Sequence, residues 1–206
     1  MTPVVICDVG PRDGLQNEPE SLAPAVRADL IGRLAAAGLA RIEAVSFVRD
    51  DRVPQMAGAE EVVAAADRGT AELSGLVLNE RGFERFAATT LDRVNVTFAA
   101  TETFNERNGN MSLADAVAQA EAIVDMAGAW HRTVTISVAF GCPFEGRVDP
   151  GVVADLAARL AGRAEVVLAD TIGVATPSHV RALVAQTGAQ GFHGHNTRNT
   201  GYANAL

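Results

Sequence analysis

The stretch V-G-P-R-D-G-L-Q-N-E, residues 9–18, carries the most information about the fold of this chain. It directly follows V-V-I-C, residues 4–7, a short apolar run with the composition of a buried strand. Glycine and proline end regular structure, so Arg12 and Asp13 are expected where the chain leaves a sheet. In parallel α/β proteins, that end of a strand is where sites are built. The stretch therefore predicts a polar site at the carboxyl end of the first strand.

Short apolar runs alternate with alanine-rich amphipathic stretches along the whole chain. The runs are rich in valine and isoleucine and are bounded by glycine, proline or polar residues, as strands are. We expect strands at residues 4–8, 41–45, 73–78, 93–98, 133–140, 165–169 and 190–195. We expect helices from Ser21 to Gly38, from Ser112, from Pro150 to Leu160 and from Pro177 to Thr187. This alternation predicts right-handed βαβ units and a parallel sheet.

Polar residues follow strand after strand, and this pattern favours a closed barrel over an open sheet. No G-x-G-x-x-G follows the first strand, which argues against a dinucleotide-binding sheet. Sites assembled from many strand ends are typical of the TIM (β/α)8 barrel, which has eight strands and typically ~250 residues. We therefore expect one catalytic α/β domain over residues 1–206, a TIM barrel with about seven of its eight βα units present. Its C-terminal part is expected to be missing from this sequence.

Charge and composition exclude several classes of function. A net charge of -8 and a pI near 5.0 argue against nucleic acid or an anionic membrane as partner, since both bind basic faces. The sequence has no lysine, which excludes chemistry through a lysine Schiff base. Cys7 and Cys142 show no metal-ligand spacing, which fits a reduced, cytoplasmic setting. No apolar run is long enough to cross a bilayer, and no signal peptide is expected before the first strand.

The sequence H-G-H at residues 193–195 is a candidate metal site. Residues two apart in a strand point to the same face, so His193 and His195 would project together. Two imidazoles and one carboxylate form a three-point cradle for a divalent cation, and Asp13 is the candidate carboxylate. Alone, H-x-H is more often a pair of surface or packing histidines. Together with R-D-G, it favours a metal site.

Arg12 and Glu43 are candidate catalytic residues, each with a structural alternative. The rigid fork of donors on Arg12 suits a developing oxyanion, but Arg12 is equally suited to an ion pair with Glu18 or Glu43. Glu43 lies inside the apolar strand R-I-E-A-V and needs a partner there. It would hold Arg12, orient a metal-bound water or serve as a base, and a purely structural ion pair is an equal alternative.

Three further residues have competing interpretations. Cys142 is a potential nucleophile, yet no histidine neighbour is evident, and a small buried hydrophobic residue is the better interpretation. Asp170 and Thr171 follow the apolar run V-V-L-A and would bind substrate or hydrogen-bond one of the two histidines. Asp170 is equally suited to capping a turn or helix.

Five motifs, in order, resemble those of the 3-hydroxy-3-methylglutaryl-CoA lyase family. They are V-G-P-R-D-G-L-Q-N-E, I-E-A-V-S-F-V with V-P-Q-M, A-F-G-C-P-F-E-G, A-D-T-I-G-V-A-T-P and H-G-H-N-T. The resemblance spans the whole chain. It implies a TIM barrel that cleaves a 3-hydroxy-3-methylglutaryl-CoA-like thioester to acetyl-CoA and a keto acid, acetoacetate. Leucine degradation is the corresponding pathway.

The resemblance also implies roles for individual residues. Asp13, His193 and His195 correspond to the ligands of a divalent cation, Mg or Mn. Two histidine ligands favour Mn or another transition-metal ion over Mg on intrinsic preference, which leaves the identity of the metal open. Arg12 corresponds to the residue that steadies the enolate oxygen, and Glu43 to the glutamate beside the site. Substrate contacts are expected from a set of five residues: Arg12, Gln16, Ser46, Asp170 and Thr171. An acyl-CoA is the expected partner, and a homo-oligomer is compatible with the pattern.

Two departures separate this chain from the family pattern. The family supplies a further asparagine ligand and a catalytic cysteine beyond H-x-H, and this sequence ends before either, so Asn204 and Cys142 do not inherit those roles. The family's H-x-H-D-T reads H-G-H-N-T here, which points to another branched 3-hydroxyacyl-CoA. The alternatives are a Claisen-condensing enzyme of the same superfamily and a non-catalytic truncated paralogue.

Overall fold

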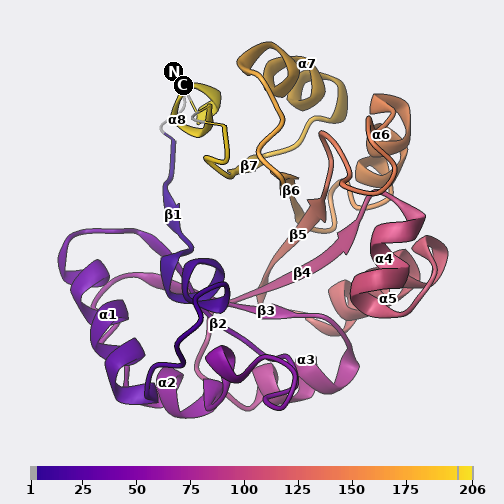
Figure 1. Ribbon diagram of the computed structural model, residues 1–206. Coiled ribbons are helices and arrows are strands. Elements are labelled where there is room, and N and C mark those ends of the chain that lie inside the picture. Colours follow the sequence, from indigo (N-terminus) through magenta and orange to yellow (C-terminus); the bar gives the residue numbers. More distant parts are fainter. Residues whose placement is uncertain (1–3, 199, 206) are drawn as a thin grey trace. The chain divides into compact units, whose positions relative to one another are not determined.

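The computed structural model describes residues 4–198 and 200–205, and these form two compact units. Unit 1 holds the residues up to 95 together with 129–131, and unit 2 holds 96–128 and the residues from 132 onward. Within the described residues, the strands of the sheet follow chain order from β1 to β7 (Figure 1). No helix of the described chain is both long and apolar enough to cross a membrane.

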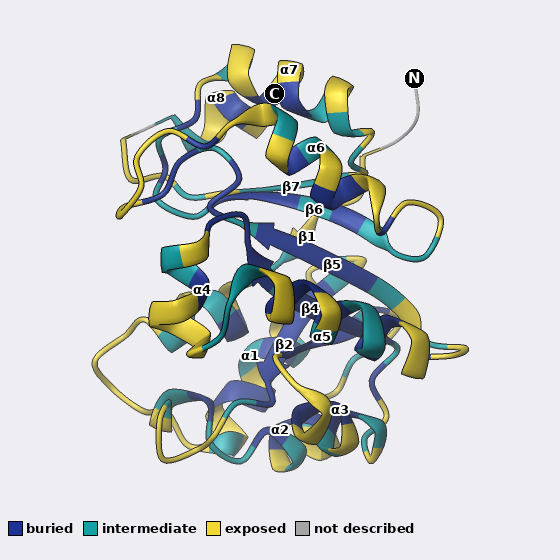
Figure 2. Ribbon diagram, turned by 90° about the vertical axis from the view of Figure 1, so that its right-hand side faces the viewer, coloured by how far each residue is buried: buried dark blue, intermediate teal, exposed yellow. Residues whose placement is uncertain are grey.

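In unit 1, parallel strands alternate with short helices. Its elements are β1 (Cys7–Asp8), η1 (Gly10–Gly14), α1 (Pro24–Ala36), β2 (Arg41–Ser46), η2 (Pro54–Met56), α2 (Ala59–Ala65), β3 (Glu72–Val77), α3 (Glu80–Ala87) and the first residues of β4 (Arg93–Ala99). β2 lies between β1 and β3 and pairs with both in parallel. The side chains of Ile42 on β2 and Leu73 on β3 are fully buried. Figure 2 draws most of β2 in the dark blue of buried residues.

Four aromatic rings close the core of unit 1. Trp130 meets Phe83 edge-on at 6.0 Å and Phe86 at 5.6 Å between ring centroids. Phe86 also meets Phe47 edge-on at 6.0 Å. Edge-to-face contacts at these distances stabilise a core beyond the area that they bury. Because Trp130 is the one tryptophan in the sequence, its fluorescence reports on the folding of unit 1.

In unit 2, the same alternation of parallel strands and helices continues. Its elements are the end of β4, α4 (Glu102–Gly109), α5 (Leu113–Met126), β5 (His131–Ser137, of which His131 belongs to unit 1), α6 (Pro150–Ala158), β6 (Glu165–Asp170), α7 (Pro177–Thr187), β7 (Gly191–Gly194) and α8 (Gly201–Ala205). β6 pairs in parallel with β5 and with β7. In the core of unit 2, the aliphatic side chains of Ile136 on β5 and Leu168 on β6 are fully buried.

The predicted strands are all present, with corrected ends. The first is only Cys7–Asp8 rather than 4–8, because its register with β2 begins at Cys7 opposite Arg41. The fifth ends at Ser137 rather than 140, because Val138 takes a left-handed φ of 51° and turns the chain out of the sheet. The seventh ends at Gly194 rather than 195, because β6, its neighbour, ends at Asp170. The remaining strands differ from their predicted ends by at most one residue.

The predicted helices are present as well. The helix expected from Ser21 begins at Pro24, with Ala23 as its first capping residue, and Gly38 follows its end with a φ of 91°. Ser112 caps α5 by accepting a hydrogen bond from the backbone N–H of Asp115, as the sequence pattern predicts. The final helix α8 lies where the sequence pattern indicates a helix at the end of the chain. The shorter helices α2, α3 and α4 were not predicted, since seven or eight residues carry too little periodicity.

Candidate active site

The R-D-G motif forms a single tight turn at the end of β1. The backbone N–H groups of Arg12, Asp13 and Gly14 all donate to the carbonyl oxygen of Val9, at 3.2, 2.7 and 3.2 Å. Proline stands in the first turn of this π-helical segment, where its missing N–H costs no hydrogen bond. The turn buries Arg12 and leaves Asp13 half-buried. One turn therefore places the side chain of Arg12 in the interior and leaves that of Asp13 partly accessible.

Arg12 is held by two carboxylates of unit 1. Its Nε donates to Glu43, and one terminal nitrogen donates to Asp13 Oδ1 at 2.7 Å. Asn95 donates to the other oxygen of Glu43 at 2.5 Å. Both oxygens of Glu43 therefore accept hydrogen bonds, and the geometry favours the interpretation in which Glu43 holds Arg12. Asn95 was missed from sequence, although a polar residue inside the apolar strand R-V-N-V-T-F was the available signal.

A β-bulge in β2 accompanies this arrangement. Glu43 lies opposite Ser74 and Val45 opposite Gly75, so Ala44 is an extra residue in the ladder. Bulges re-aim side chains and occur next to active sites. A Cβ at Gly75 would lie 2.7 Å from the ring of Phe47, so this position has no room for a larger residue.

Ser46 and Gln16 each carry a buried polar atom that no described residue satisfies. Ser46 Oγ and Gln16 Oε1 have no hydrogen-bond partner within residues 4–198 and 200–205. Buried polar groups normally have partners, so unpaired ones call for an explanation such as a ligand or a bound water molecule. Both residues belong to the predicted substrate contacts.

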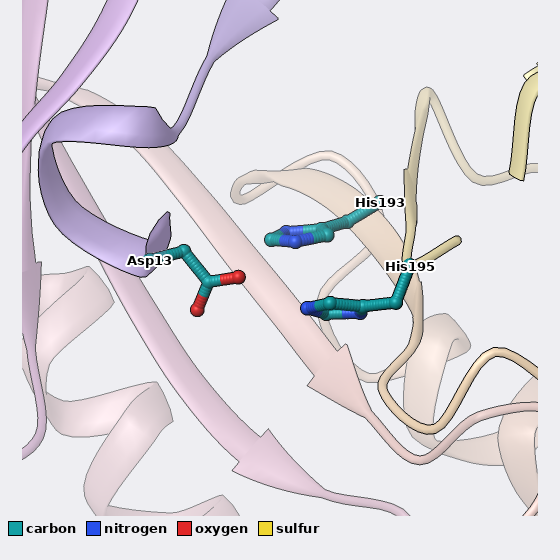
Figure 3. Close-up of side chains that lie close together, drawn as sticks. All are labelled: Asp13, His193 and His195. Carbon is teal, nitrogen blue, oxygen red and sulfur yellow. The ribbon is translucent and has the colours of Figure 1, made fainter. Parts of the chain in front are cut away.

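The two histidines of H-G-H lie side by side in unit 2. His193 is on β7 and His195 directly follows it, and their rings stack with 4.9 Å between centroids and 23° between planes. Nδ1 of His195 lies 3.0 Å from the carbonyl oxygen of Asp170. Figure 3 shows the stacked imidazoles of His193 and His195, and the side chain of Asp13 on η1. The predicted common orientation of the two imidazoles is therefore present.

Asp170 and Thr171 shape the ends of β6 and β5. The Asp170 carboxylate is 1% exposed and accepts from the backbone N–H groups of Val174 at 2.8 Å and Ala175 at 3.0 Å. Thr171 Oγ1 accepts from the backbone N–H of Val138 at 2.8 Å. The turn-capping interpretation of Asp170 agrees with these contacts, and contact of either residue with substrate stays a prediction.

Cys142 is a buried small residue, as expected. Its side chain is 3% exposed, and its sulfur lies 3.2 Å from the hydroxyl of Thr101, which donates to it. The pair packs inside unit 2, and Cys142 is part of the loop that joins β5 to α6. This environment agrees with a packing role.

Comparisons with known proteins agree with the motifs. The profile of the HMGL-like family matches residues 3–206. The chain is 42% identical to the (R)-citramalyl-CoA lyase of Chloroflexus aurantiacus, over the whole chain and 72% of that protein. It is 37% identical to the mitochondrial hydroxymethylglutaryl-CoA lyase of Rattus norvegicus, over 98% of the chain and 66% of that protein.

The solved structures confirm the predicted fold class. The crystal structure of hydroxymethylglutaryl-CoA lyase from Pseudomonas aeruginosa matches with a TM-score of 0.92 and 37% identity, over 98% of this chain and 71% of that one. The fold is thus of the TIM-barrel type, and the chain spans about two thirds to seven tenths of the length of these proteins. By its sequence profile, its relatives and its fold, this chain belongs to the HMGL-like family, and these relatives are carbon–carbon lyases.

Proposed function

We propose that this protein is a divalent-metal-dependent lyase that cleaves a 3-hydroxy-3-methylglutaryl-CoA-like thioester to acetyl-CoA and a keto acid. The observation that carries the proposal is the stacked pair His193 and His195 in a chain that also has the R-D-G turn. Similarity to two acyl-CoA lyases at 42% and 37% identity supports it.

Asp13, His193 and His195 are the proposed ligands of the cation. The donor set suits such an ion, because two imidazoles and a carboxylate are ligands that Mn2+ and its neighbours accept. The carbonyl of Asp170 can only accept a hydrogen bond, so Nδ1 of a neutral His195 carries the proton and Nε2 carries the lone pair. A bound cation supplies Lewis-acid polarisation of the oxygen atoms of the substrate.

Arg12 is the proposed stabiliser of negative charge. Cleavage removes the proton of the tertiary hydroxyl and breaks the adjacent carbon–carbon bond. The electron pair passes to the thioester as an enolate, whose carbon then takes up a proton. Arg12 is already fixed by Glu43 and Asp13, so its remaining donors need no reorganisation to meet the enolate oxygen. Glu43 contributes by fixing Arg12, since Arg12 and Asn95 already occupy its two oxygens.

Gln16 and Ser46 are the proposed polar contacts of the substrate. Their unsatisfied atoms, an amide oxygen and a hydroxyl, offer an acceptor and a donor. A substrate that carries a hydroxyl and a carboxylate would satisfy both. We further propose a cytoplasmic enzyme with a role in leucine degradation, with which a homo-oligomer is compatible.

A citramalyl-CoA-like substrate is the second candidate. The chain is 42% identical to a citramalyl-CoA lyase, and Asn196 replaces the aspartate of the family motif H-x-H-D-T. Both candidates are branched 3-hydroxyacyl-CoA thioesters that give acetyl-CoA or a related thioester on cleavage. The two candidate substrates differ in the branch of the acyl group. The proposed roles of Arg12 and of the three metal ligands are the same for both.

The test is cleavage by purified protein with and without metal. Metal-free protein, prepared with a chelator, is given each thioester alone and with Mn2+ or Mg2+, and the products are identified by mass spectrometry. We expect cleavage only with metal. An unchanged rate without metal would contradict the metal proposal, condensation of a keto acid with acetyl-CoA would indicate a Claisen-type enzyme, and no turnover would favour a non-catalytic paralogue.

A further inference from the structure

The turn that follows β6 lies directly against the His195 segment within unit 2. It runs over residues 170–175, and β6 and β7 are in register at Ala169 with His193 and at Asp170 with Gly194. This register brings the Asp170 carbonyl beside the residue that follows Gly194. Asp170 is one of the most deeply buried polar residues of the chain, so the turn is part of the core of the unit.

The Asp170 carboxylate fixes the shape of the turn. One oxygen accepts from the Val174 N–H and the other from the Ala175 N–H. A buried carboxylate is stable only when it is well hydrogen-bonded, and charge-assisted bonds of this kind are the stronger ones. The amide of Asn204 adds a hydrogen bond to the Ala175 carbonyl at 3.1 Å. The turn is therefore a rigid support.

The carbonyl oxygen of Asp170 is shared between the turn and the histidine. It accepts from the Gly173 N–H at 3.1 Å and from Nδ1 of His195 at 3.0 Å, which uses both of its lone pairs. Hydrogen bonding at one ring nitrogen sets the tautomer and leaves the other nitrogen as the potential ligand.

Gly173 sets the distance between the turn and the histidine segment. Its φ is 63°, and a Cβ there would lie 2.7 Å from Thr197 Cβ and 2.9 Å from the carbonyl oxygen of His195. The second contact is to backbone, which yields less readily than a flexible side chain. Any larger residue at position 173 would push the His195 segment away from the Asp170 carbonyl.

We propose that Asp170 and Gly173 are positioning residues that fix the ring orientation and the Nδ1–H tautomer of His195. The proposal rests on the proposed function in treating His195 as a metal ligand, and it adds two residues that act through the ligand. Neither residue contacts the cation in this scheme. They orient Nε2 of His195 as the ligand atom already in the metal-free protein.

The test compares Gly173→Ala with Gly188→Ala. Gly188 has a similar φ of 66°, and no atom lies within 4 Å of the place that a Cβ would take, so its substitution adds similar backbone strain without the contact to His195. Long-range 1H–15N spectra of the four histidines report the tautomer in metal-free protein. Titration with Mn2+ then reports affinity.

We expect wild-type protein and Gly188→Ala to show the Nδ1–H tautomer of His195. Gly173→Ala should lose it and bind Mn2+ about 10–100-fold more weakly, the usual cost of losing support for a metal ligand. If Gly173→Ala does not fold, Asp170→Asn replaces it, because an amide nitrogen cannot accept from the backbone and so weakens the same turn. Loss of the tautomer supports the proposal.

Two outcomes would overturn the proposal. One is an Nε2–H tautomer in wild-type metal-free protein. The other is a test variant that keeps the same His195 tautomer as Gly188→Ala and binds Mn2+ with an affinity within about twofold of that control. Such a result would fall well short of the 10–100-fold loss of affinity expected when a metal ligand loses its support. Failure of the proposed function gives a different result, because wild-type protein would then bind no Mn2+. The tautomer of His195 in metal-free protein would still test whether Asp170 and Gly173 position the ring.

Discussion

Replacing Glu43 with alanine should destabilise unit 1 severely. The side chains of Arg12 and Glu43 are only 9% and 5% exposed, so the substitution leaves a buried guanidinium without its main acceptor. Removing one partner of a buried ion pair typically costs about 3–5 kcal/mol. Arg12 keeps Asp13 at 2.7 Å, which places the expected loss at about 3 kcal/mol. That loss is a large part of the ~5–15 kcal/mol that stabilises a typical domain.

The assay is urea unfolding followed through the fluorescence of Trp130, which is half-buried against the rings of Phe83 and Phe86 in the same unit. The matched control is Glu84→Ala on α3, an exposed glutamate for which a change within ~0.5 kcal/mol is expected. Glu43→Gln keeps one acceptor oxygen and should lose less than Glu43→Ala. The reasoning is refuted if Glu43→Ala unfolds at the same urea concentration as Glu84→Ala.

Three further predictions concern unit 1. Arg27 is fully buried with its guanidinium on the Ala57 carbonyl, and burial lowers its pKa. Arg27→Met should therefore be close to neutral in urea unfolding, whereas Arg27→Ala should cost about 2–5 kcal/mol through the cavity it leaves. Burial alone would raise the pKa of Glu72, but the hydrogen bonds to Arg93 and His131 and the charges of Arg93 and Arg41 together lower that pKa below its ordinary 4.5. Glu72 thus contributes stability above that pH and loses it on acidification, so Glu72→Gln should reduce the fall in unfolding free energy between about pH 5 and 3. Phe86→Ala should cost about 3–5 kcal/mol in thermal or urea unfolding.

The architecture and the candidate residues were largely predictable from local pattern. Apolar runs of period two and alanine-rich helical stretches depend only on residues that are close together in the chain. They can therefore be recognised without knowledge of the fold. The same holds for R-D-G and H-G-H, since a strand end and a two-residue spacing define where those side chains point. This is why the strand alternation and the stacking of His193 with His195 agree with the sequence.

What could not be predicted depends on residues distant in the chain. The bond between Asn95 and Glu43 joins residues 52 apart, and the bulge at Ala44 appears only in the register of β2 with β3. Val138 has a left-handed φ although it is β-branched, a conformation that only the surrounding packing can impose. No local propensity indicates these features.

His195 and the Arg12 cluster, which consists of Arg12, Asp13, Glu43 and Asn95, are fixed by different kinds of interaction. This difference can be tested. Glu43 acts on Arg12 through charge, whereas His195 is held by a backbone carbonyl within unit 2. Glu43→Gln should therefore leave the Nδ1–H tautomer and 15N shifts of His195 unchanged in metal-free protein, even as it loosens Arg12. The measurement is the same histidine spectrum, with Gly173→Ala as the positive control for a changed tautomer. A tautomer change in Glu43→Gln would mean that the ligand is set by the charge of the Arg12 cluster, and the local account of His195 would have to be abandoned.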